Sequence, residues 1–159
     1  MKPFANLLVL VLLVAPLLYL AISCASAADL KTIVKDANVQ RKLLGRHMLS
    51  LQWLHFGKNQ YGSASVTRTD NQLLLAGEQV SKEGDPGYLK INGRITEVNS
   101  SGFKFHGKIV YSVKSIKDGK ECVRDGDYTF LAKGARKYWR MQEMESSCSE
   151  VTDYVDLYF

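Results

Sequence analysis

The residues best suited to chemistry gather near the end of the chain, where the stretch RKYWR occupies positions 136–140. Arginine offers a fixed fork of hydrogen-bond donors that suits a carboxylate or a phosphate. Tyr138 and Trp139 add flat apolar surface, so this stretch could hold a small anionic or apolar ligand. The regular alternation also fits a β-strand whose Trp139 belongs to a core and whose charges, Arg140 among them, face solvent. Both interpretations stay open on the sequence alone.

Patterns typical of catalytic and metal sites are absent from the sequence. It contains no Gly-x-Ser-x-Gly elbow, phosphate-binding loop or dinucleotide fingerprint. The histidines lack the spacing of a metal site; they are His47, His55 and His106. Glycoside hydrolysis needs two carboxylates at a defined separation, and the acids that could provide them are Glu143, Glu145, Asp153 and Asp156. We therefore predict no catalytic residue, no metal and no cofactor, with a hydrolase as the weaker alternative.

The first residues predict export. Lys2 precedes an apolar run that extends from Leu7 to Ile22, and Ala25-Ser26-Ala27 follows, which is the order of a secretory signal peptide. We expect residues 1–27 to be removed and the protein to be periplasmic or secreted. Two alternatives tether the same domain to a membrane: a retained leader that acts as an anchor, or lipidation at Cys24.

The cysteines support export. Cys122 and Cys148 are the only pair beyond the leader, and an even count in an exported chain predicts a disulfide. The formal charge of +5 falls to +4 when Lys2 is removed with the leader. There is no run of five or six like charges, so we predict no specific nucleic-acid partner.

The rest of the chain predicts one mainly β domain. Residues 28–45 have apolar positions on one helical face, with Asp29 as a possible cap and Gly45 as a stop. Residues 46–159 contain eight strand-like runs of period two joined by short turns. We expect an eight-stranded antiparallel up-and-down β-barrel, lipocalin-like, with the helix packed on one mouth. A flatter sheet wrapped on the helix is the alternative.

Pairing CVRDGDYTFLA with RKYWRMQEM as a hairpin around residues 133–136 predicts a register. A four-residue loop places Ala132 opposite Lys137, and therefore Phe130 opposite Trp139. In this register Trp139 is on the buried face and Arg140 points outward. The alternative reverses the two faces and places Arg136, Tyr138 and Arg140 in the barrel lumen, where they would hold an anionic ligand.

These features predict a noncatalytic binding protein whose barrel holds a small apolar or anionic ligand. The residues expected at the ligand site are Phe103, Phe105, Tyr111, Tyr128, Phe130, Trp139 and Arg140. The alternative is an envelope interaction protein, for example an inhibitor of an envelope enzyme, that acts through loops such as 83–87 and 146–151. A filled interior favours the interaction protein, whereas an empty lumen favours the ligand-binding protein.

The segments FKFHGKIVYSV, CVRDGDYTF, RKYWRMQEM and TDYVDLYF together resemble a group of small exported bacterial proteins of unknown function. This similarity extends from Tyr61 to Phe159, and its most specific part is RKYWR with the ending DYVDLYF. It implies bacterial export and adds no catalytic residue. The likeness to lipocalins rests on strand number, because LQWLHFG replaces the Gly-x-Trp entry of that family.

Overall fold

The computed structural model describes residues 31–54, 61–81, 85–146, 148 and 150–159. The expected signal peptide, with the alternatives of a retained anchor or a lipidated Cys24, lies outside these residues. The elements are β1 Ile33–Val34, α1 Ala37–Leu43, β2 Gly45–Leu51, η2 Gln52–Leu54, β3 Gly62–Thr69, β4 Gln72–Ser81, β5 Gly87–Asn99, β6 Gly102–Val113, η3 Lys117–Gly119, β7 Cys122–Leu131, β8 Tyr138–Met141 and β9 Val155–Tyr158.

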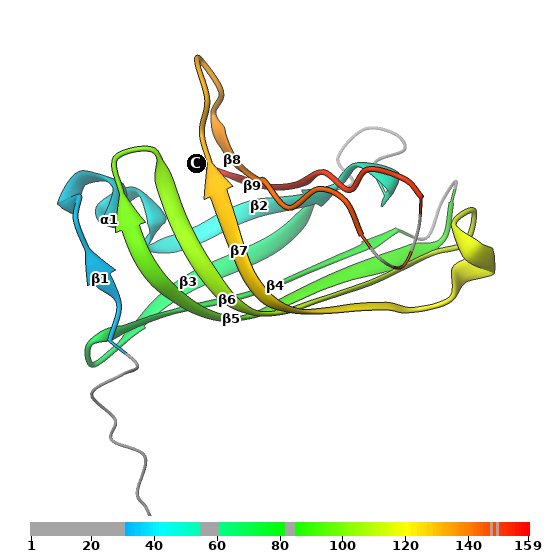
Figure 1. Ribbon diagram of the computed structural model, residues 1–159, viewed down its shortest axis with the longest axis horizontal. Coiled ribbons are helices and arrows are strands. Elements are labelled where there is room, and N and C mark those ends of the chain that lie inside the picture. Colours follow the sequence, from blue (N-terminus) through cyan, green and yellow to red (C-terminus); the bar gives the residue numbers. More distant parts are fainter. Residues whose placement is uncertain (1–30, 55–60, 82–84, 147, 149) are drawn as a thin grey trace, which may run out of the picture.

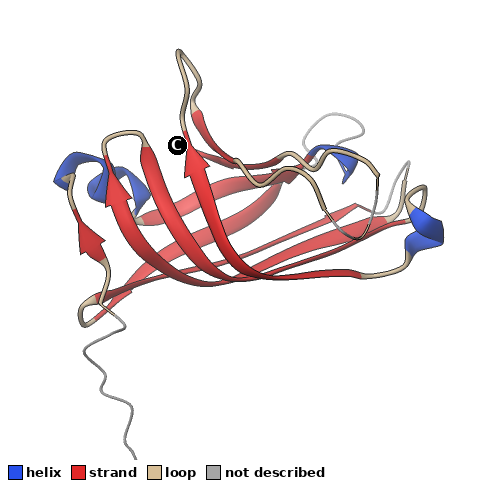
Figure 2. Cartoon of the chain, in the orientation of Figure 1, coloured by secondary structure: helices blue, strands red, loops and turns tan. Residues whose placement is uncertain are grey.

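Strands β2 to β9 form a closed antiparallel β-barrel in which each strand pairs with its neighbour in the chain (Figures 1 and 2). The ring closes because β9 pairs with β2, with Leu157 opposite Leu49. Helix α1 lies at one end of the barrel and the turn η3 at the other (Figure 1). The predicted eight-stranded up-and-down barrel is therefore confirmed. Among the residues described, no helix has the length and apolar character needed to cross a membrane.

The N-terminal helix is shorter than the predicted span of residues 28–45. Asp36 caps α1, because its Oδ1 accepts hydrogen bonds from the backbone N–H groups of Asn38 and Val39, each 2.9 Å away. Residues 33–34 instead form β1, which pairs in parallel with β5. Ile33 and Val34 are β-branched, and such side chains favour an extended backbone. They pair with Glu97 and Val98 of β5, which lie beyond the end of its pairing with β4. The predicted helix was thus wrong over residues 33–34, and residues 28–30 lie outside the described residues.

The hairpin between β7 and β8 has a different register from the predicted one. Phe130 lies opposite Met141, and Leu131 lies opposite Arg140. The connecting loop is longer than expected, spanning residues 132–137, and Gly134 adopts φ +62° within it. The predicted register is wrong by two residues, but a shift of two keeps every side chain on its expected face. Trp139 is accordingly buried and Arg140 faces outward.

Beyond this hairpin the barrel wall is irregular. The Gln142 N–H donates to the Thr129 carbonyl at 2.8 Å, and the chain then leaves β7 before it reaches β9. Residues 142–154, which we call the strap, fold back on themselves through a bridge between Glu145 and Thr152. Figure 1 shows this orange-to-red segment running beside β7. Side chains, more than backbone ladders, must therefore hold the strap in place.

Candidate functional site

The six aromatic residues predicted at the ligand site all lie inside the barrel. They are Phe103, Phe105, Tyr111, Tyr128, Phe130 and Trp139, and none is more than 6% exposed. The Phe103 and Phe130 rings stack with centroids 4.9 Å apart, and Trp139 meets Phe103 edge-on at 5.7 Å. These contacts fill the barrel with side chains where the rings lie. Space for a ligand must then be found at the barrel ends or outside.

Arg140 does not join this group, because it lies on the outer face of β8. Its Nε and Nη2 donate to the two carboxylate oxygens of Asp156, at 2.8 and 2.7 Å. Its guanidinium lies 4.1 Å from the ring centroid of Tyr154 and 5.2 Å from that of Tyr138. The hydrogen bonds to Asp156 raise the pKa of Arg140 above its ordinary value. Arg140 is therefore already paired and stacked.

A hollow of about 330 Å³ opens at the barrel end that carries α1. Its apolar side includes Val39, Trp139 and Phe159, and the last two rings lie 4.2 Å apart. Its basic side includes Lys42 from the last turn of α1, and Lys137 from the β7–β8 loop. The buried Trp139 thus forms part of the lining of this hollow.

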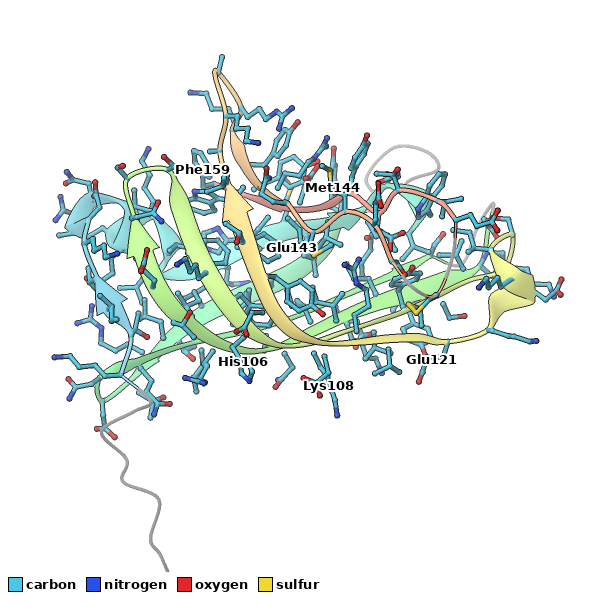
Figure 3. All side chains as sticks on the ribbon, in the orientation of Figure 1. His106, Lys108, Glu121, Glu143, Met144 and Phe159 are labelled. Atoms are coloured by element: carbon cyan, nitrogen blue, oxygen red, sulfur yellow. A yellow bond between two sulfur atoms is a disulfide. The ribbon has the colours of Figure 1, made fainter. Side chains whose placement is uncertain are left out.

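A second hollow of about 430 Å³ adjoins the first and shares Lys42 and Phe159 with it. The Lys42 Nζ lies 5.1 Å above the Phe159 ring, and Phe159 is labelled in Figure 3. We call the two hollows together the basic mouth, after its four cations: Lys42, Arg46, Arg136 and Lys137. No aspartate or glutamate lines either hollow, and within the part of the chain that the structure describes no carboxylate forms an ion pair with these four cations. An anion entering here would meet cations that no described residue engages in an ion pair.

Sequence reasoning missed Lys42, Arg46 and Phe159 as members of a site. The sequence did predict a helix over one mouth of the barrel, and Arg41 and Lys42 are basic residues of the last helical turn. Combining these two points would have placed Lys42 at the mouth. Nothing local in the sequence links it to Phe159, which follows β9 more than a hundred residues later.

A buried charge cluster occupies another part of the interior and holds the strap. The Asp153 side chain is 0% exposed and that of Arg124 is 9% exposed, with Nη1 3.3 Å from Oδ2. Asp153 also accepts hydrogen bonds from Tyr111 Oη at 2.7 Å and Trp53 Nε1 at 3.3 Å. The Arg124 Nη2 donates to the Glu143 carbonyl and to another strap carbonyl. The strap is thus tied to β6, β7 and η2 through one carboxylate.

The four acids proposed for a hydrolase do not share a cleft. Asp153 is enclosed in the buried cluster, whereas Asp156 pairs with Arg140 on the outer face. Glu143 accepts a hydrogen bond from the Thr129 N–H at 2.7 Å, which caps the end of the β7–β8 ladder. The carboxylates of Asp153, Asp156 and Glu143 are therefore engaged in holding the fold, and Glu145 is exposed.

The histidines are also separated. His47 is buried near the basic mouth, and His55 lies outside the described residues. His106 is on the outer wall with its Nδ1 2.9 Å from Asp127, and Figure 3 shows it pointing away from the barrel. Over residues 31–159, with the undescribed positions left aside, no group of three histidine, cysteine or acidic residues could hold a metal ion.

Cys122 and Cys148 form the predicted disulfide. Their sulfurs are 2.01 Å apart and their Cα atoms 5.6 Å apart. The bond joins the first residue of β7 to the middle of the strap. It therefore acts on the same segment as the buried Arg124–Asp153 pair.

Replacing both cysteines with alanine is expected to lower the free energy of unfolding by about 3–4 kcal/mol, because the unfolded chain regains the entropy of an open loop. Urea unfolding, followed by circular dichroism, measures this loss. Reductant should destabilise the unaltered protein and leave the double variant unchanged. A midpoint that is insensitive to reductant in the unaltered protein would contradict a stabilising disulfide.

Comparison with known proteins places the chain among bacterial relatives. The model of the PM1083 family matches residues 31–159. A protein of Pasteurella multocida (strain Pm70), named "Uncharacterized protein PM1083", is 38% identical over 149 residues, which cover 94% of this chain and 93% of that protein. No solved structure matches the chain, so the likeness to lipocalins stays a prediction from strand number. Since the family model spans every described element, from β1 to β9, the chain belongs to the PM1083 family.

Proposed function

We propose that the protein is an exported, noncatalytic binding protein that holds a small amphipathic anion at the basic mouth. The observation that carries the proposal is the set of four cations beside the Trp139–Phe159 ring pair, none of which forms an ion pair with a described residue. The cations supply long-range attraction and hydrogen bonds to an anionic group. The rings supply an apolar surface for the rest of the ligand. The disulfide supports an oxidising compartment, as expected of a periplasmic or secreted protein.

The proposed site differs from the lumen site that the sequence suggested. Of the six interior aromatic residues only Trp139 lines the basic mouth, and the other five belong to the hydrophobic core of the barrel. In this proposal Lys42, Arg136 and Lys137 bind the anion, in place of Arg140. Among the described residues no ion pair engages those three side chains, whereas Arg140 is engaged by Asp156.

A second candidate function is an envelope interaction protein, and the outer face of β8 and β9 favours it. Tyr138, Tyr154 and Tyr158 gather there around Arg140, and Met48 is 50% exposed nearby. Tyrosine, arginine and methionine are enriched in protein interfaces. The loops 83–87 and 146–151 lie partly outside the described residues. Loss of a defined envelope partner in Tyr154→Ser, with retention in Lys42→Gln, would favour this function over the first.

The ligand proposal is tested with two fluorescent probes that share one ring system. 1-Anilinonaphthalene-8-sulfonate (ANS) carries a sulfonate, whereas N-phenyl-1-naphthylamine (NPN) is neutral. We expect saturable binding of ANS that is tighter than that of NPN. The double variant Lys42→Gln/Lys137→Gln should raise the Kd of ANS about tenfold, since two charge contacts of surface strength are lost.

Lys90→Gln is the matched control, because Lys90 is an exposed cation of β5 outside both hollows. It should leave both Kd values unchanged. The affinity of NPN should also survive the double variant. Equal losses of ANS affinity in Lys90→Gln and in the double variant, or no ANS binding at all, would overturn the proposed site.

A further inference from the structure

His47 lies beneath the basic mouth, between the end of α1 and the end of β9. Its Nε2 is 2.7 Å from the Leu43 carbonyl oxygen, and its Nδ1 is 2.8 Å from the Tyr158 carbonyl oxygen. The side chain is buried, and its ring meets Trp139 edge-on at 6.0 Å. His47 therefore connects two elements that both contribute to the proposed ligand site.

Both partners of His47 are carbonyl oxygens, which only accept hydrogen bonds. A neutral imidazole has one N–H and one lone pair, so it satisfies one carbonyl and directs its lone pair at the other. The imidazolium has two N–H groups and donates to both. The geometry around His47 therefore fits the doubly protonated, positively charged ring, and loss of one proton replaces one hydrogen bond with a repulsive contact.

The two carbonyls belong to residues next to the shared lining of the mouth. Leu43 follows Lys42 in α1, and Tyr158 precedes Phe159. Lys42 and Phe159 are the two residues common to both hollows. A change in either hydrogen bond of His47 therefore displaces the backbone next to Lys42 or Phe159, the residues that line both hollows.

The charged side chains around His47 are cations. Lys42 of α1 lines the second hollow together with His47, Arg46 precedes His47 in β2, and Lys137 of the β7–β8 loop lines the first hollow together with Trp139. Burial raises the pKa of Tyr158 on β9, which keeps that phenol neutral, and His47 lies opposite the uncharged Ala64 of β3. None of the carboxylates that the structure describes forms an ion pair with His47. The neighbouring cations oppose the imidazolium, and an anion in the mouth would offset this repulsion.

We infer that His47 is a pH-dependent positioning residue of the basic mouth. Its imidazolium clamps the end of α1 to the end of β9, so anions bind strongly while His47 is doubly protonated and more weakly as the pH rises. Linkage makes the effect reciprocal: a bound anion must in turn hold the second proton on His47. This inference rests on the proposed function, because it describes the regulation of that same site.

The first experiment follows the ring nitrogens of ¹⁵N-labelled histidine by nuclear magnetic resonance. Saturating ANS should move the loss of the second ring proton of His47 to higher pH. The sulfonate of ANS stays ionised throughout, so the probe does not titrate. His106, exposed and paired with Asp127, is the internal control and should not respond to ANS. A titration of His47 that ANS leaves unmoved would overturn the inference.

The second experiment measures the Kd of ANS between about pH 5.5 and about pH 8. The unaltered protein and His106→Gln should lose affinity about tenfold over this range. His47→Gln carries a permanently neutral amide and should give a nearly flat profile. ANS binding with the same pH profile in His47→Gln and the unaltered protein overturns this inference alone, whereas no ANS binding at any pH overturns the proposed function. If His47→Gln does not fold, the resonance experiment on the unaltered protein decides.

Discussion

Replacing Asp153 with alanine is expected to lower the free energy of unfolding by about 3–5 kcal/mol. The change leaves the Arg124 guanidinium buried without its carboxylate, and it also removes the carboxylate that accepts from the Tyr111 hydroxyl and the Trp53 N–H. A buried charge without a partner loses its hydration and gains nothing in return. Urea unfolding followed by circular dichroism measures the loss directly.

The double variant Arg124→Met/Asp153→Ala distinguishes the charge effect from simple loss of packing. Removing both charges should restore part of the stability lost in the single variant, because no unpaired charge then remains. Asp127→Ala is the matched control, since its side chain is 85% exposed and its partner His106 is on the surface. It should change the stability little. A double variant that is less stable than Asp153→Ala would show that Arg124 holds the strap through its carbonyl contacts alone.

The strap shows where sequence reasoning reached its limit. A β-strand with one buried face shows apolar residues at every second position. This pattern predicted the barrel, and it predicted that Trp139 faces the interior and Arg140 the exterior. Residues 142–154 have no such period. Asp153 finds its partners at Trp53, Tyr111 and Arg124, far apart in the chain, and no local pattern relates these positions.

The errors in register and helix length have the same physical origin. A register depends on loop length, and the loop 132–137 is two residues longer than the predicted one. The predicted inward and outward directions of the side chains are still correct, because a shift of two residues keeps each side chain on the same face of the sheet. Residues 33–34 became a strand through a free edge of β5, which exists only once the barrel has formed.

For Arg140 the predicted outward direction is correct, but it does not reveal how much the side chain contributes to stability. A residue that points outward suggests a solvated charge, and on that basis Arg140→Ala would leave stability nearly unchanged. The structure instead pairs Arg140 with Asp156, whose side chain is only 6% exposed. Removal of the arginine leaves a nearly buried carboxylate without its ion-pair partner. We therefore expect Arg140→Ala to lower the free energy of unfolding.

Replacing Trp139 with alanine is expected to lower the free energy of unfolding by about 3–5 kcal/mol. The ring is 2% exposed and contacts Phe103, Phe159 and His47. Alanine leaves a cavity that these rigid neighbours cannot fill, because they are fixed by strand pairing and by the two hydrogen bonds of His47. Urea unfolding followed by circular dichroism avoids the change in fluorescence that the substitution itself causes.

Added indole tests whether the loss comes from the cavity. An apolar cavity of this origin binds a matching small molecule, and binding to the folded state alone raises the unfolding midpoint. Indole should therefore stabilise Trp139→Ala and leave the unaltered protein unchanged. Lys137→Ala, at an exposed position of the β7–β8 loop two residues before Trp139, should show neither the loss nor the rescue. If Trp139→Ala were as stable as the unaltered protein, the ring would not be packed beneath the basic mouth, and the mouth would lack its apolar floor.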